Sequence, residues 1–271
     1  MKRFTIFAFL LCLLLIALTG FGKRMKVLAI GNSFSADAVE QYLWEMAAEV
    51  GDTLVIGNAY IGGCNIDRHT ANFEKSLPIY SYRLIENGLL SSTEDVTLQD
   101  IITDRDWDLI SLQQASPLSG NSSSYGNLPT LISYVREIMP NKDAEIVWHS
   151  TWAYARDFDS DNFKYYGYSQ EAMYDSIMNV AAAIIPAMGI RRVIPSGIAI
   201  QNARESFGDI LNRDGYHLSI PLGRYVAACT WAEFLTGCDV RDLTFKPSDL
   251  SEEETSKAKV AAHVAFSRLS D

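Results

Sequence analysis

Basic residues are scarce in this 271-residue sequence, since 23 lysines and arginines stand against 33 aspartates and glutamates, giving a net charge of -10. A chain without a basic surplus has little with which to neutralise a phosphate backbone or an anionic membrane surface, so nucleic acid is not expected as a partner. Hydrophobic residues make up 48% of the chain and charged residues 21%, which is the balance of a compact globular protein. These proportions exclude a disordered chain, a collagen and a coiled coil.

Cysteine is scarce as well, and only Cys64, Cys229 and Cys238 lie beyond the N-terminal apolar segment. Cys229 and Cys238 could form a disulfide, but a chain of this length buries enough apolar surface to fold without one. Cys64 could be a catalytic thiol, although a small buried hydrophobe is the commoner role of a single cysteine. Disulfides are therefore not expected to define this fold.

Metal and nucleotide motifs are missing from the sequence. No histidine or cysteine cluster has the spacing of a metal site, and the Gly31-Asn32-Ser33 segment lacks the further glycines of a phosphate-binding loop. The stretch from Asp157 to Asn162 imitates the start of a calcium loop, but Tyr168 stands where a bidentate glutamate should close it. We expect the chemistry of this protein to need neither a metal nor another cofactor.

Residues 1–22 have the pattern of a secretory signal peptide. Lys2 and Arg3 precede an apolar run from Phe4 to Leu18, which is short for a membrane span. Cys12 lies in the middle of that run and not at its end, so lipidation is not expected, whereas an uncleaved anchor is the alternative. We expect the mature chain to begin near Lys23 and to be periplasmic or extracellular, without stable insertion in a membrane.

Short β-rich runs alternate with longer helical patterns after residue 23, which favours parallel strands joined by crossover helices. Several runs are continuously apolar, as a sheet covered on both faces requires. The pattern predicts one three-layer α/β/α domain over residues 23–271, with a central parallel sheet of about five strands. The expected strands are Lys26 to Ile30, Thr53 to Tyr60, Asp108 to Leu112, Ala144 to His149 and Arg192 to Pro195.

The clearest helix follows the first strand, and Ser35 or Asp37 is expected to cap it. Apolar residues recur at helical spacing in this helix, at Val39, Leu43, Met46 and Val50, and Gly51 is expected to end it. Further helices are expected over Tyr125 to Met139, Ser169 to Met188, Pro221 to Leu235 and Ser251 to Arg268.

Three stretches interrupt the alternation of strands and helices. We expect Asn65 to Asp95 and Trp152 to Gly167 to be excursions over the carboxyl edge of the sheet, and Ser116 to Asn127 to be a mobile loop. The second excursion is rich in Tyr, Phe and Asp, which is common in substrate-binding loops.

Ser33 lies in the segment that joins the first strand to the following helix. Ligands of open parallel sheets bind at the carboxyl ends of the strands, and backbone N–H groups at a helix start can stabilise an oxyanion. A serine at this position is well placed to be a nucleophile. The alternative is that Ser33 caps the helix, but Ser35 and Asp37 are in better register for that role.

Asp214 and His217 lie three residues apart in a segment that precedes a predicted helix. On a tight turn this spacing lets the carboxylate reach Nδ1 of the imidazole, which leaves Nε2 free to act as a general base toward Ser33. The alternative is an ordinary surface turn. A serine, a histidine and an aspartate in these contexts predict nucleophilic catalysis.

Together these two motifs resemble the SGNH/GDSL hydrolase superfamily, whose nucleophile follows the first strand and whose D-x-x-H motif lies near the C-terminus. Asn32 stands where that family usually has Asp. The resemblance implies a flavodoxin-like fold, and an oxyanion hole formed by the N–H of Ser33 and that of Gly62 or Gly63.

The superfamily's third block, usually Gly-x-Asn-Asp, is replaced here by Leu112-Gln113-Gln114-Ala115-Ser116. We expect a glutamine side-chain amide to replace asparagine as the third oxyanion donor, with Gln113 as first choice and Gln114 as second. The sequence is similar in this respect to a branch of the superfamily that contains carbohydrate acetylesterases, and also to a group of uncharacterised secreted proteins with the same G-N-S-F-S and L-Q-x-x-S pattern. The resemblance therefore implies an exported serine esterase acting on short acyl groups, such as O-acetyl groups on carbohydrate.

Four further residues are expected near the substrate. Trp152, Tyr154 and Tyr125 are candidate sugar-stacking aromatics, and His149 is a candidate pocket residue because it ends the fourth expected strand. A lipase or thioesterase on the same fold is one alternative function. A catalytically inactive carbohydrate-binding protein is another.

Overall fold

A computed structural model of the chain describes residues 22–267, so the expected signal peptide lies outside the described residues except for Gly22. Within this part of the chain, seven strands form one sheet in the order β4-β3-β2-β1-β5-β6-β7. The strands are β1 (Arg24–Gly31), β2 (Thr53–Tyr60), β3 (Tyr80–Glu86), β4 (Leu89–Val96), β5 (Leu109–Leu112), β6 (Glu145–His149) and β7 (Val193–Ile194). The five predicted strands correspond to β1, β2, β5, β6 and β7, and all five are parallel.

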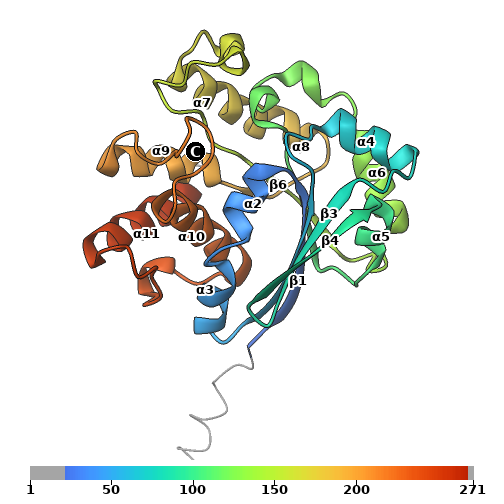
Figure 1. Cartoon of the computed structure of the whole chain (residues 1–271), viewed down its shortest axis with the longest axis horizontal. Coiled ribbons are helices and arrows are strands. Elements are labelled where there is room, and N and C mark those ends of the chain that lie inside the picture. The colour runs from blue at the N-terminus through green and yellow to red at the C-terminus, as the bar shows by residue number, and fades with distance from the viewer. Residues whose placement is uncertain (1–21, 268–271) are drawn as a thin grey trace, which may run out of the picture.

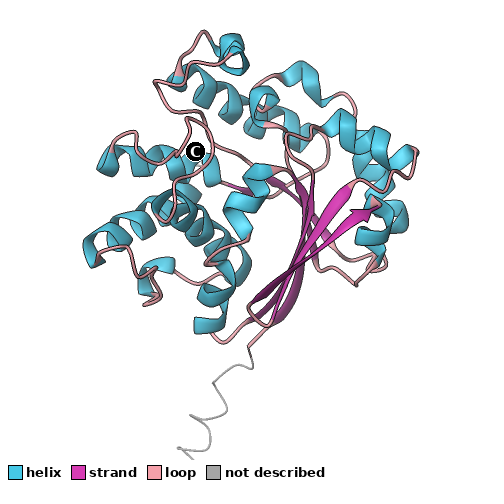
Figure 2. Ribbon diagram, in the orientation of Figure 1, coloured by secondary structure: helices cyan, strands magenta, loops and turns pink. Residues whose placement is uncertain are grey.

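Helices cover both faces of the sheet, which confirms the three-layer α/β/α architecture (Figures 1 and 2). One core contains residues of α2 (Ser33–Val39), α3 (Leu43–Glu49), α7 (Gln170–Asn179), α9 (Ser196–Phe207), α10 (Leu222–Thr236) and α11 (Glu252–Ser267). The other core contains residues of α4 (Ile66–Glu74), α5 (Leu98–Thr103), α6 (Leu128–Ile138) and α8 (Ile185–Ala187). None of the helices in residues 22–267 combines the length and the apolar character needed to cross a membrane.

The hairpin of β3 and β4 corrects the expected strand number and the interpretation of Asn65 to Asp95. These residues form α4 and an antiparallel hairpin that extends the sheet beyond β2. The exposed sequence of β4 lacks an apolar face, so hydrophobic periodicity does not reveal it. Asn87 and Gly88 turn the chain with φ angles of 54° and 74°, and an Asn-Gly pair is a strong local hairpin signal that could have revealed this element.

The first predicted helix is divided into α2 and α3. The break lies at residues 40–42, where Tyr42 adopts a φ of 70°. Asn32 caps α2 by accepting a hydrogen bond from the backbone N–H of Phe34 at 3.0 Å, so the expectation that Ser35 or Asp37 caps this helix is wrong. The cap places Ser33 at the first position of α2.

The three described cysteines are unpaired, so the disulfide considered between Cys229 and Cys238 is not formed. Burial raises the pKa of the Cys64 thiol to about 12, which keeps it protonated and unreactive at neutral pH. This environment supports the buried structural role expected for Cys64.

Candidate active site

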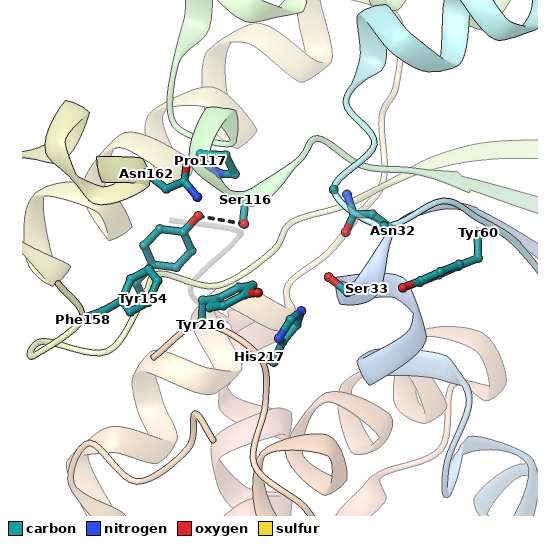
Figure 3. A pocket seen from close by; sticks show the side chains of 12 residues that line it. Asn32, Ser33, Tyr60, Ser116, Pro117, Tyr154, Phe158, Asn162, Tyr216 and His217 are labelled. Atoms are coloured by element: carbon teal, nitrogen blue, oxygen red, sulfur yellow. Dashed lines mark hydrogen bonds between the residues drawn. The ribbon is translucent and has the colours of Figure 1, made fainter. Parts of the chain in front are cut away.

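A pocket of about 470 Å³ opens at the carboxyl ends of β1, β2 and β5. Three of its walls are formed by segments that follow these strands, and the others are formed by residues 154–162 and 216–217. Figure 3 shows side chains from all these segments converging on one space. The lining residues are Asn32, Ser33, Tyr60, Gly62, Gly63, Ser116, Pro117, Tyr154, Phe158, Asn162, Tyr216 and His217.

Ser33 reaches this pocket because the chain turns sharply between β1 and α2. A Cβ atom on Gly31 would lie 2.6 Å from Ser35 Oγ and 2.9 Å from Gln113 Cδ, so this close approach requires glycine. Neither the hydroxyl nor the backbone N–H of Ser33 is bonded to another residue in the described part of the chain. Both groups are therefore available to a ligand.

Asp214 and His217 form the interaction that their spacing predicts. Asp214 Oδ2 accepts a hydrogen bond from His217 Nδ1 at 2.7 Å, and Asp214 Oδ1 accepts one from the backbone N–H of His217 at 2.8 Å. Burial acts to raise the pKa of Asp214, but hydrogen bonds from the side chain and backbone of His217 outweigh it and leave this pKa below its ordinary value. The carboxylate is therefore ionised and fixes the imidazole with Nε2 unoccupied.

A glycine shapes the turn that carries this pair. Gly215 has a φ of 89°, and a Cβ atom there would lie 2.1 Å from a ring carbon of Phe158. Only glycine meets both conditions without strain. Tyr216 then packs against His217 with ring centroids 3.9 Å apart.

His217 and Ser33 face one another across the pocket (Figure 3). No hydrogen bond joins these two side chains in the described residues. Catalytic hydrogen bonds are often long in unliganded enzymes and shorten when substrate binds. The arrangement supplies a free hydroxyl, an oriented imidazole and an ionised carboxylate in one pocket.

Gln113 and Gln114 do not line the pocket, which corrects the expectation that one of their amides is the third oxyanion donor. Gln113 is only 3% exposed, and its Nε2 donates to Asn32 Oδ1 at 3.0 Å. Gln114 Nε2 donates to the carbonyl of Ser124 at 3.1 Å, and its Oε1 accepts from the N–H of Ile66. Both amides are thus committed to buried partners.

A buried chain of hydrogen bonds runs from Ser196 to Asn32. Ser196 Oγ lies 3.0 Å from His149 Nε2, and His149 Nδ1 donates to Gln113 Oε1 at 2.8 Å. Gln113 in turn donates to Asn32, whose Nδ2 donates to the carbonyl of Cys64 at 3.0 Å. The chain therefore crosses the carboxyl ends of β7, β6, β5, β1 and β2, five neighbouring strands of the sheet.

His149 is a member of this chain and not a pocket residue, which corrects its expected position. It is fully buried, and burial lowers its pKa to about 3. The imidazole is therefore neutral at physiological pH. A neutral ring that donates from Nδ1 accepts a hydrogen bond from the hydroxyl of Ser196 at Nε2.

Backbone N–H groups provide the clearest anion-binding candidates. Those of Ser33, Gly62 and Gly63 all belong to pocket-lining residues, and none donates to another group within residues 22–267. Gly63 has a φ of 62°, so the loop after β2 depends on glycine at that position. These N–H groups can stabilise a negative charge that develops beside Ser33.

The three predicted aromatics differ in their positions. Tyr154 lines the pocket, and its hydroxyl lies 2.8 Å from Ser116 Oγ. Trp152 is buried beneath the pocket, stacked on Phe34 with ring centroids 4.3 Å apart. Tyr125 is buried and donates to the carbonyl of Ser119, so stacking of substrate on Trp152 or Tyr125 is not supported.

Several lining residues were not predicted from the sequence, namely Asn32, Tyr60, Ser116, Pro117, Phe158, Asn162 and Tyr216. The signal for some of them was present, since Asn32 and Tyr60 stand at the carboxyl ends of predicted strands. Apart from His217, the lining contains no ionisable side chain other than the tyrosines.

Within residues 22–267, one group of potential metal ligands lies outside the residues that line the pocket. Glu233, Asp239 and His263 place one ligand atom each within 4.8 Å of one another. His263 Nδ1 lies 2.8 Å from Glu233 Oε1, while Asp239 pairs with the Arg241 guanidinium. The sequence spacing gave no indication of this group.

The fold and the pocket define an α/β/α protein with a Ser, His and Asp grouping at the carboxyl edge of its sheet. The chain belongs to the family described as "Domain of unknown function (DUF4886)", which it matches over residues 26–265. A DUF4886 protein from Bacteroides uniformis ATCC 8492, solved by crystallography, has 46% sequence identity and a TM-score of 0.88, with 90% of this chain and 95% of that one covered.

Two further solved structures are similar at lower identity. TesA has 11% identity and a TM-score of 0.47, covering 80% of this chain and 99% of that one. A mutant of the acetyl-xylooligosaccharide esterase Axe2 from a Geobacillus has 15% identity and a TM-score of 0.43, covering 83% and 96%. Because both TM-scores are below 0.5, the activity of neither enzyme is carried over to this chain. No curated protein is significantly similar to the sequence.

Proposed function

We propose that this protein is a serine hydrolase that cleaves short acyl esters, with Ser33 as nucleophile, His217 as general base and Asp214 as the residue that orients it. One observation supports the proposal most strongly: the unbonded hydroxyl of Ser33 shares a pocket with a His217 ring fixed by Asp214 at 2.7 Å. Nucleophile, base and orienting carboxylate are the three parts of this type of catalysis.

In the proposed reaction Ser33 Oγ attacks the ester carbonyl while His217 Nε2 takes the hydroxyl proton. The N–H groups of Ser33 and of Gly62 or Gly63 stabilise the oxyanion of the tetrahedral intermediate. The bond to the alcohol oxygen then breaks, and His217 returns the proton to that oxygen. Water attacks the acyl-serine with His217 again as base, which releases the carboxylic acid and restores Ser33.

The pocket favours a neutral substrate. Its lining includes the rings of Tyr60, Phe158 and Tyr216 together with the amide of Asn162, and no lysine or arginine to bind an anionic group. Small amphipathic molecules such as acylated sugars fit this combination of aromatic rings and hydrogen-bonding groups. We therefore propose O-acetyl groups on carbohydrate as the substrate class, and export by residues 1–22 as the route to it.

The experiment that tests this proposal is labelling of the purified protein with a fluorophosphonate probe, followed by release of p-nitrophenol from acetyl, butyryl and octanoyl esters. We expect labelling and acetyl-ester turnover in the wild type, and loss of both in Ser33→Ala and His217→Ala. His263→Ala is the matched control, because His263 also lies 2.8 Å from a carboxylate but outside the pocket.

The outcomes separate the alternatives. Preference for the octanoyl ester would favour a lipase or thioesterase. Absence of labelling in the wild type would overturn the hydrolase and favour a carbohydrate-binding protein. Equal labelling of wild type and Ser33→Ala would remove Ser33 from the mechanism.

A further inference from the structure

Asp37 is a buried carboxylate one helical turn after Ser33. Its side chain is 1% exposed, and it belongs to α2, the helix that begins at Ser33. Residues four apart lie on the same face of a helix, so Asp37 stands beneath the nucleophile on the same rigid element. The proposed mechanism does not use this carboxylate.

The hydrogen-bond partners of Asp37 come from the segment that carries the proposed base. The Arg213 guanidinium donates to both carboxylate oxygens at 3.1 and 3.2 Å, and the backbone N–H of Leu218 donates to Oδ2 at 2.8 Å. Arg213 immediately precedes Asp214, and Leu218 immediately follows His217. One carboxylate therefore holds both ends of the Asp214–His217 segment.

A second arginine also pairs with Asp37. Arg224 of α10 places its guanidinium 2.6 Å from Asp37 Oδ1 and also donates to Gln41. A buried carboxylate is costly unless it is paired and hydrogen-bonded, and removal of one partner leaves the others uncompensated. The packing at this position therefore depends on the carboxylate of Asp37.

The segment held by Asp37 is closed at its base by further backbone hydrogen bonds. The N–H of Arg213 donates to the carbonyl of His217 at 2.9 Å, and the N–H of Ser219 donates to the carbonyl of Leu211 at 2.7 Å. Asn212 and Leu218 form an antiparallel bridge across the same loop. The loop is also held by the N–H of Ala155, which donates to the carbonyl of Gly215 at 2.7 Å, and by Trp152 Nε1, which donates to the carbonyl of Tyr216 at 2.8 Å. Asp37 supplies the hydrogen bonds that join this loop to α2.

We infer that Asp37 is a positioning residue that sets the separation between Ser33 Oγ and His217 Nε2 by clamping the His217 loop to the nucleophile's own helix. The inference rests on the proposed function. A misplacement of about 1 Å between reacting groups can lower a rate by about 100-fold. Asp37→Asn keeps the shape of the side chain but loses the charge that holds the two arginines, so we expect a loss of that order in kcat with little change in KM.

The test compares the full chain with Asp37→Asn in two measurements. Hydrogen exchange followed by mass spectrometry reports the protection of residues 211–219, and the rate of fluorophosphonate labelling reports the activation of Ser33. We expect faster exchange confined to this loop, and labelling slowed by about 100-fold. Should Asp37→Asn not fold, Arg213→Gln takes its place, because the Arg213 side chain is 35% exposed and its loss removes the same contact.

Two control variants separate positioning from general destabilisation. Glu86 lies in the β3–β4 hairpin and pairs with Arg105. Glu86→Gln therefore replaces a paired carboxylate by an amide, as Asp37→Asn does, but away from the pocket. Leu131→Ala creates a cavity in the core of α6 and lowers stability without contacting α2 or the His217 loop. Neither variant is expected to slow labelling of the folded protein.

The double variant Asp37→Asn with Arg213→Gln completes the test. If the two side chains act through one another, the double variant is labelled no more slowly than the slower single variant. Labelling of Asp37→Asn at the wild-type rate, with the wild type reactive, overturns the clamp and leaves the proposed function intact. A wild type that is not labelled overturns the proposed function and the catalytic role of the clamp together.

Discussion

Replacing Gln113 with leucine tests the interpretation of the buried polar chain. The substitution keeps most of the side-chain volume and removes the amide that connects His149 to Asn32. Asn32 Oδ1 keeps its hydrogen bond from the N–H of Phe34, so the cap of α2 persists. His149 Nδ1 is left as a buried donor without a partner.

The magnitude follows from these contacts. An orphaned buried donor costs about 1–3 kcal/mol, and the lost hydrogen bond to Asn32 adds about 1 kcal/mol. We therefore expect Gln113→Leu to lower the free energy of unfolding by about 2–4 kcal/mol. Replacing both partners by apolar residues removes the orphan, so Gln113→Leu with His149→Leu is expected to cost at least about 1 kcal/mol less than the sum of the two single variants.

Urea unfolding followed by tryptophan fluorescence measures these differences, since the chain contains five tryptophans. Ester turnover supplies a second measurement. A direct oxyanion donor is worth about 100- to 1000-fold in kcat, whereas Gln113 acts only through Asn32, so we expect a decrease of about tenfold at most in the folded variant. A stability loss below about 0.5 kcal/mol, or strict additivity of the double variant, would refute the buried chain. A kcat loss of 100-fold or more would restore Gln113 as a donor.

Three further predictions follow from the structure. Burial lowers the pKa values of His69 and His149 to about 3 from an ordinary 6.5, so the unfolded chain binds more protons below pH 6.5. The free energy of unfolding should therefore fall as the pH decreases from about 6.5 toward 3, by about 2 kcal/mol per histidine at pH 5. Urea titrations at pH 7 and pH 5 measure this difference, and equal stability at both pH values would contradict the prediction. Gly215→Ala introduces a Cβ atom 2.1 Å from Phe158 at a φ of 89°, so we expect a lower melting temperature and at least a tenfold loss of ester turnover; wild-type turnover would show that this turn does not set the position of His217. Cys238 is the one partly exposed thiol among the three described cysteines, so a thiol reagent should modify it in the native protein before the other two, and simultaneous modification would indicate that the α10 region opens readily.

The sequence predicted most of the parallel sheet because its strands are apolar runs with clear helical patterns between them. β2 has the bounds that were expected, and all five expected helical regions contain helices, the first of them divided in two and the other four with shifted ends. The β3–β4 hairpin was not predicted because the residues of β4 are exposed up to Val96, so no hydrophobic periodicity marks this strand. The division between α2 and α3 was not predicted because Val39, Leu43 and Met46 keep a buried face through the break, so the helical spacing looks continuous.

The local sequence determined where Ser33 and the Asp214–His217 pair lie relative to the neighbouring strand and turn. A short turn between β1 and α2 fixes the position of Ser33, and a three-residue spacing on a tight turn is enough to bring Asp214 to His217. Such arrangements depend on contacts between near neighbours, which a sequence contains in full. The tertiary structure decided which polar side chains face the pocket and which are buried beneath it. Gln113 and His149 stand at strand ends as the sequence predicted, but their side chains point toward neighbouring strands. Gln113 donates to Asn32, and His149 donates to Gln113, so neither faces a ligand. Asp37 meets residues 176 and 181 positions later in the chain, and only the packing of α2 against the His217 loop creates that contact.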